Sequence, residues 1–273
     1  MEEAVGNRTV HPVPPLLPMR TSSPDVVRVL DQIRFQLDTL DEQPGSDDYA
    51  EFTWFAREYP RCYRYHLACA EYRLRGIHSL FCEIHEELAP KVAETPTLSY
   101  TAIEHLRVYR IYWDFESFLS EICIALDLLA RVAGTAYSQP MPPNFNRFCK
   151  KEGDNGLLRI MKRAQLRWVN RLKDYRDCFT HYTPVDTALQ VGLTQYSDGF
   201  HIRARLPVNP NVRDILGFRF ARRVELLRYA CTVWQHMTAL DRAVAAEIAR
   251  AFANGDYPKR TSNLFFLGQR ERK

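Results

Sequence analysis

The sequence lacks the features that mark several classes of protein. No apolar run reaches the length needed to cross a membrane, so we expect no membrane partner. The seven cysteines form no C-x-x-C pair and no zinc-ligand spacing, and most lie in apolar stretches where a thiol behaves as a small core residue. The first residues carry acidic Glu2 and Glu3 and scattered prolines, unlike a signal peptide. We therefore expect a protein of the reducing cytoplasm.

Motifs that would name a common enzyme class are also missing. There is no phosphate-cradling glycine loop, no G-x-S-x-G nucleophile elbow and no dinucleotide-binding fingerprint. The 46% hydrophobic and 26% charged content is that of a globular protein. A net charge of +4 is too weak to indicate nucleic acid by itself, but 30 of the 37 basic residues are Arg. Arginine is the better bidentate partner of phosphate, although a biased genome would give the same composition.

The pattern along the chain predicts an all-α helical bundle with a small inserted β-hairpin. Residues 1–22 form a proline-rich, flexible or wrapping arm, residues 23–257 a single helical domain, and residues 258–273 a basic tail. The hairpin is expected at about 188–206, around a turn at Ser197-Asp198-Gly199. Apolar spacing, helix caps and the positions of proline and glycine predict helices from Ser23-Pro24-Asp25 to about 40, from 46 over Phe52 to Phe55, and at about 61–88, 100–133, 157–182 and 213–254.

One short stretch suggests chemistry, the R-D-x-x-x-H pattern formed by Arg176, Asp177 and His181. On an α-helix Asp177 and His181 share a face as an i, i+4 pair, so the carboxylate can orient the imidazole. By the same geometry Arg176 and His181 lie about 140° apart, although a long Arg side chain can reach the same cleft. RNA cleavage needs a base for the 2′-hydroxyl, an acid for the leaving oxygen and a positive charge on the phosphorane. His and Arg can supply all three without a metal.

This stretch resembles the HEPN superfamily, whose motif is an Arg and a His separated by four to six residues, with Asn, Asp or His after the Arg. The resemblance covers about Tyr100 to Tyr182, with a long apolar helix, a loop and the motif helix. It implies a HEPN-like core at about 100–182 and a homodimer whose cleft gathers two copies of Arg176 and His181. The implied activity is a metal-independent endoribonuclease without a cofactor, acting on RNA as a toxin or defence effector and held in check by an antitoxin or regulatory protein. Asp177 would support the site.

Further residues extend or compete with this hypothesis. A basic run leads into the motif, so Arg171, Lys173 and Tyr182 are candidate substrate-binding residues; a solvated helix face explains the same run. His78 and His85 share a helix face, but two turns, roughly 10 Å, separate them, so we predict no metal site there. The alternative to the enzyme is a non-catalytic helical module that binds a protein or a nucleotide.

Overall fold

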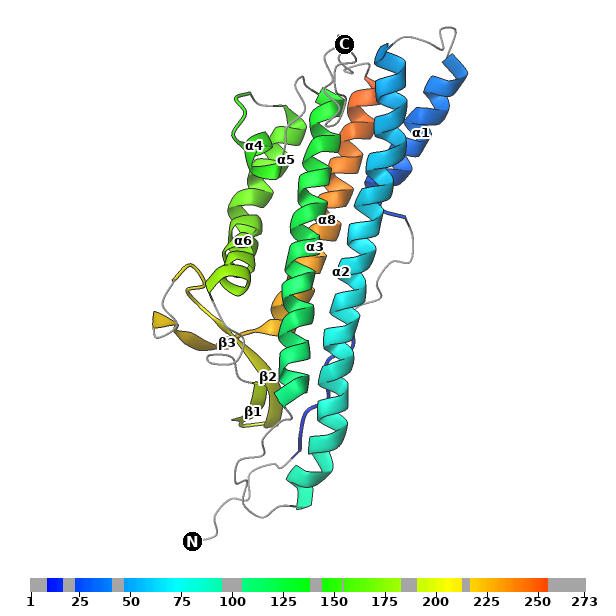
Figure 1. The fold of residues 1–273 in the computed structure, drawn as a ribbon. Helices are drawn as coiled ribbons and strands as arrows, with labels where there is room; N and C mark the ends of the chain where they lie inside the picture. Colours follow the sequence, from blue (N-terminus) through cyan, green and yellow to red (C-terminus); the bar gives the residue numbers. More distant parts are fainter. Residues whose placement is uncertain are drawn as a thin grey trace, which may run out of the picture. The chain divides into compact units, whose positions relative to one another are not determined.

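The chain is mostly helical, with a small antiparallel sheet late in the sequence (Figure 1), which confirms the predicted class at this level. A computed structural model describes residues 9–16, 23–40, 47–94, 105–137, 144–153, 155–182, 191–212 and 217–254. Within these ranges, no helix is both long and apolar enough to cross a bilayer. In chain order the elements are α1 (Asp25–Leu40), α2 (Asp47–Glu94), α3 (His105–Tyr137), α4 (Phe145–Cys149), α5 (Gly156–Ala164), the π-helical turn η1 (Gln165–Val169), α6 (Asn170–Asp177), the π-helical turn η2 (Cys178–Tyr182), β1 (Val191–Tyr196), β2 (Gly199–Pro207), β3 (Phe220–Glu225) and α8 (Leu226–Ala253).

Two compact units divide the chain. The sheet unit comprises Met1–Met19, Cys69–Ser120 and Leu172–Trp234, and the helical unit comprises Arg20–Ala68, Glu121–Arg171 and Gln235–Lys273. Helices α2, α3 and α8 each contribute residues to both units. The candidate sites described below lie in the sheet unit.

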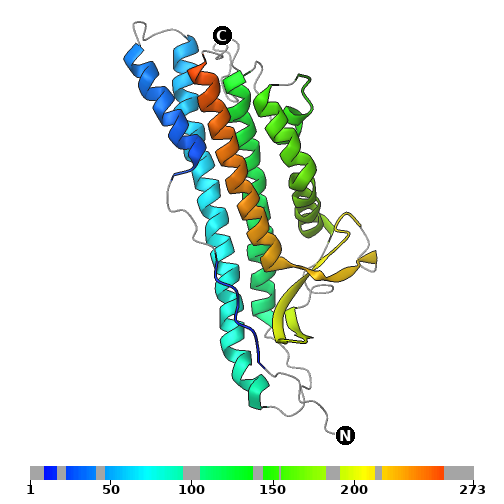
Figure 2. The same cartoon turned by 180° about the vertical axis from the view of Figure 1, so that it is seen from behind.

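In the helical unit, α1 lies beside α2 and α8 (Figure 2), and its first turn is capped from α8. The helix begins at Asp25, directly after Pro24, as the sequence predicts. The carboxylate of Asp241 accepts the amide N–H of Asp25 at 2.6 Å and the hydroxyl of Tyr63 at 3.0 Å. Asp241, which is 216 positions from Asp25 in the chain, therefore accepts a hydrogen bond from an amide that has no partner within α1.

Two predicted helix ends are wrong, because α2 continues through the prolines that were expected to stop it. The sequence suggested a short helix over Phe52 to Phe55, a new helix from Arg61 and an end before Pro90, whereas α2 runs unbroken from Asp47 to Glu94. Proline in a helix interior costs about 3 kcal/mol or more. Beside Pro60, however, Tyr59 and Tyr63 are buried, and beyond Pro90 Val92 is buried. Continuing the helix keeps these apolar side chains out of water, which outweighs the lost hydrogen bond.

The predicted helix at 213–254 is wrong in its first part. Phe220–Glu225 forms the strand β3, which pairs antiparallel with β2 and completes a sheet of order β1-β2-β3. Helix α8 starts only at Leu226, where the side chain of Glu225 accepts the amide hydrogens of Leu227 at 2.9 Å and Arg228 at 2.8 Å. The strand forms because the backbone edge of β2 is available for pairing. The helical spacing of apolar residues carries no information about such a distant partner.

The predicted hairpin is confirmed, and its edge also holds part of the N-terminal arm. Strands β1 and β2 pair from Val191↔Ala204 to Tyr196↔Gly199, and Gly199 has a φ of +139°, a conformation in which a side chain is strained. Val10 forms a parallel bridge with Phe200. The amide of Phe200 donates to the carbonyl of Thr9 at 2.9 Å, and the amide of His11 donates to the carbonyl of Phe200 at 2.8 Å. The arm is thus attached through its backbone at this point.

Candidate functional site

The predicted motif residues lie on the helical segment at residues 172–182, which begins the last stretch of the sheet unit. Leu172, Tyr175, Cys178 and Phe179 are buried, so this segment presents one side to the core. Arg176 and Asp177 lie between these core positions, with side chains 37% and 43% exposed, and His181 is exposed. All three predicted catalytic side chains are therefore at least partly exposed to solvent.

Buried aromatic contacts fix how this segment is rotated about its own axis. The hydroxyl of Tyr175 donates a hydrogen bond to the carbonyl of Pro207, at the end of β2, at 2.7 Å. The ring of Phe179 stacks on that of Tyr112 and meets the edge of Phe115, both on α3, with ring centroids 6.0 and 5.5 Å apart. A buried, hydrogen-bonded tyrosine beside interlocked rings leaves little freedom to turn, so the exposed face keeps its direction.

Arg176 and Asp177 form an ion pair with each other. Nε of Arg176 lies 2.8 Å from Oδ1 of Asp177, but the angle at this buried nitrogen falls outside that of a hydrogen bond, so the contact is mainly electrostatic. A phosphate would use the two terminal guanidinium nitrogens of Arg176 in a bidentate contact.

The helix that carries His181 is not a regular α-helix. Cys178–Tyr182 forms a π-helical turn, so the α-helical angles expected between Arg176, Asp177 and His181 do not apply after Asp177. A turn closed by i→i+5 hydrogen bonds holds more residues than the 3.6 of an α-helix. Residues five apart, such as Arg176 and His181, are then separated by an angle around the helix axis that is smaller than the 140° of an α-helix. π-helical turns inside α-helices are frequent at functional sites.

The predicted substrate-binding residues are distributed over both units. Lys173 is half-buried in the sheet unit, and Arg171 is half-buried in the helical unit together with the basic residues before it. The side chain of Tyr182 lies outside the described residues. A phosphate track formed by these residues stays a prediction.

The histidines that we weighed as metal ligands instead contact the N-terminal arm. Nε2 of His78 lies 2.9 Å from the carbonyl of Pro14, and Nε2 of His85 lies 3.1 Å from the carbonyl of Val10. A carbonyl can only accept, so both imidazoles donate. The spacing of the two histidines along the helix predicts that they share a face. It does not predict that the N-terminal arm packs against this face, because Pro14 is 64 positions from His78 and Val10 is 75 positions from His85.

No protein-family model, no curated protein and no solved structure matches this chain. The resemblance to HEPN proteins therefore stays a prediction carried by the residues themselves.

Proposed function

We propose that this protein is a metal-independent endoribonuclease of HEPN type, which cleaves RNA by attack of a 2′-hydroxyl on the adjacent phosphate. The observation that supports this proposal is the accessible face of Arg176 and His181, on a helical segment whose rotation is fixed by buried Tyr175 and Phe179. An active site needs this combination of solvent-accessible reactive groups on a rigid support.

The chemistry assigns one role to each residue. One imidazole takes the proton of the 2′-hydroxyl as its oxygen bonds to phosphorus, and a second imidazole protonates the 5′-oxygen as the P–O5′ bond breaks. A homodimer supplies both from two copies of His181. The terminal nitrogens of Arg176 stabilise the charge of the phosphorane. Asp177 holds the guanidinium in place through the ion pair. Its second proposed role is to orient the imidazole of His181. The products are a 2′,3′-cyclic phosphate and a 5′-hydroxyl.

RNA cleavage in EDTA tests the proposal. The purified protein should cut single-stranded RNA with a chelator present, and Arg176→Ala or His181→Ala should each reduce the rate by about 10²-fold or more. Both side chains are exposed or half-exposed, so both variants should fold, which circular dichroism checks. Arg64→Ala and His236→Ala, exposed residues of the helical unit, are matched controls that should keep full activity.

Two results would contradict the ribonuclease. One is cleavage by both motif variants at the rate of the unsubstituted protein. The other is the absence of cleavage by the unsubstituted protein in EDTA on any of several unstructured RNAs of mixed sequence. Cyclic phosphate ends, identified by mass spectrometry, distinguish this reaction from that of a contaminating hydrolase that leaves other ends.

The second candidate is a non-catalytic binding module. Leu106 and Trp113 lie on α3 of the sheet unit with 56% and 50% of their surface exposed, and the ring of Trp113 stacks on that of Tyr109 at 5.5 Å. Large exposed side chains of this kind are enriched at protein interfaces. Under this alternative, Trp113→Ala weakens partner binding. The unsubstituted protein cleaves no RNA, so Arg176→Ala and His181→Ala have no effect on RNA.

A further inference from the structure

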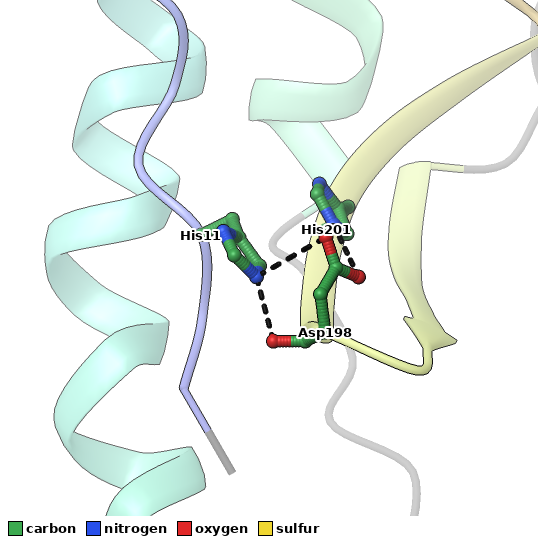
Figure 3. Close-up of side chains that lie close together, drawn as sticks. All are labelled: His11, Asp198 and His201. Atoms are coloured by element: carbon green, nitrogen blue, oxygen red, sulfur yellow. Dashed lines mark hydrogen bonds and ion pairs between the residues drawn. The ribbon is translucent and has the colours of Figure 1, made fainter. Parts of the chain in front are cut away.

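Three side chains with metal-ligating atoms meet where the N-terminal arm reaches the hairpin turn (Figure 3). They are His11 of the arm, Asp198 of the turn and His201 of β2, all in the sheet unit. One ligand atom from each lies within 4.8 Å of the other two. Nε2 of His201 is 3.3 Å from Oδ1 of Asp198, and Nε2 of His11 is 3.5 Å from Oδ2 of the same carboxylate.

The backbone places these residues together, independently of the three side chains. The two hydrogen bonds between the arm and Phe200 align His11 with the turn, and the carbonyls of Val10 and Pro14 are held by His85 and His78. Gly199 is required for this approach, because a Cβ at that position would lie 2.4 Å from the carbonyl oxygen of Thr9 and 3.1 Å from the ring of His11. The arm therefore passes directly over a position without a side chain.

The distances agree with what a transition metal requires. Bond lengths of about 2.0–2.1 Å to imidazole nitrogen and carboxylate oxygen place neighbouring ligands of a tetrahedral ion about 3.3 Å apart. Measured to one carboxylate oxygen, Oδ2 of Asp198, the separations are 3.4 Å from Nε2 of His201 and 3.5 Å from Nε2 of His11, both close to this value. Two imidazoles and one carboxylate form a common ligand set for catalytic zinc, in which water takes the fourth position. The side chains of His11 and His201 are 33% and 31% exposed, so a solvated ion can reach them.

Binding of an ion requires two local adjustments. Nε2 of His11 donates to the backbone carbonyl of Asp198 at 2.7 Å, and Nε2 of His201 donates to its carboxylate at 3.3 Å. Both protons must move to Nδ1 before these nitrogens can bind a metal. The two imidazole rings are stacked, with centroids 4.4 Å apart and planes 8° from parallel, and one ring must tilt so that both lone pairs point to one ion.

We propose that His11, Asp198 and His201 form a binding site for one divalent transition-metal ion, best suited to Zn²⁺, with a position left open to water. The bound ion links the arm to the hairpin turn through side chains, in addition to the backbone bonds. This site is separate from the motif on α6 and η2 and does not depend on the ribonuclease proposal.

Calorimetric titration of the full chain with ZnCl₂ tests the site. The unsubstituted protein should bind one Zn²⁺ per chain. His11→Ala, His201→Ala and Asp198→Ala should each lower the affinity about tenfold or more, since each removes one ligand. Gly199→Ala keeps all three ligands but pushes the arm away, so it should lower the affinity as much as His11→Ala does. His236→Ala removes an exposed histidine elsewhere and should leave binding unchanged.

Amide hydrogen exchange gives a second test, because a zinc ion bound elsewhere on the surface would not change exchange at this site. Saturating Zn²⁺ should slow exchange at the amides of His11 and Phe200, which bond the arm to β2, and Asp198→Ala should abolish this slowing. The proposal is overturned if the unsubstituted protein binds no Zn²⁺, or if His11→Ala and Gly199→Ala bind it as tightly as the unsubstituted protein. In either case the cluster serves only to attach the arm.

Discussion

Replacing Asp241 with Asn should remove a specific pH dependence from the stability of the protein. Asp241 is 5% exposed and accepts hydrogen bonds from the amide of Asp25, the amide of Val26 and the hydroxyl of Tyr63. Burial raises the pKa of its carboxyl from 3.8 to about 6, even though the hydrogen bonds from Tyr63 and Val26 and the nearby charge of Arg28 act in the opposite direction. The cost of dehydrating the charge is therefore the larger effect.

The sign of the dependence follows from the two protonation states. Between about pH 4 and pH 6 the folded protein holds a proton on Asp241 that the unfolded chain has released, so the free energy of unfolding falls as pH rises through this window. A pKa difference of about two units, at about 1.4 kcal/mol per unit, gives a loss of about 3 kcal/mol between pH 4 and pH 7.

Asn is the informative substitution because it removes the titration and keeps two of the three hydrogen bonds. Its carbonyl can accept from Asp25, and the hydroxyl of Tyr63 can accept from its amide. The long bond from the amide of Val26, at 3.4 Å, is lost, but that loss is the same at every pH. Free energies of unfolding from urea curves at pH 4, 5, 6 and 7 should therefore show Asp241→Asn gaining about 3 kcal/mol relative to the unsubstituted protein from pH 4 to pH 7. Asp31→Asn, an exposed residue of α1, is the control that should give no such gain. If the curves of Asp241→Asn and the unsubstituted protein run parallel, Asp241 takes up no extra proton on folding between pH 4 and pH 7, which contradicts a pKa raised by burial.

Two further substitutions test the supports of the sheet unit. Tyr175→Phe removes only the hydroxyl that bonds the carbonyl of Pro207, so unfolding free energy should fall by about 1–2 kcal/mol, measured by urea denaturation, while Tyr72→Phe, an exposed position, should cost nothing measurable. Glu225→Ala removes the acceptor for the first amides of α8 and should lower the free energy of unfolding by about 1 kcal/mol. Glu225→Gln keeps an acceptor oxygen and should therefore keep most of the stability. If the Ala variant is as stable as the unsubstituted protein, the cap contributes nothing.

Local patterns in the sequence were sufficient for the elements that local forces decide. Helical spacing of apolar residues found the long helices, and Ser197-Asp198-Gly199 gave the turn, because Gly199 is needed at a positive φ. The same patterns failed where a distant partner decides. Proline at 60 is a helix breaker by local rules, yet the burial of Tyr59 and Tyr63 carries α2 through it.

The same distinction separates the two candidate sites. Arg176, Asp177 and His181 lie within six positions of one another, so their grouping was visible in the sequence, although the π-helical turn beneath His181 was not. His11 and Asp198 are 187 positions apart, and only the pairing of the arm with β2 brings them together. The one local indication was a glycine in a turn next to a histidine-bearing strand, which is common without any ligand.

Strand β2 contacts both candidate sites, one at each end. Because the sites lie at opposite ends, we expect substitutions to affect zinc binding and RNA cleavage independently. At one end Phe200 bonds the arm beside the histidine cluster, and at the other Pro207 accepts from Tyr175 of the motif helix. Seven residue steps of about 3.3 Å span about 23 Å, so the two sites share no ligand and no reactive residue. His11→Ala should therefore lose zinc and keep RNA cleavage, whereas Arg176→Ala should keep zinc and lose cleavage. Parallel loss of both properties in either variant would mean that the arm and the motif helix act as one site.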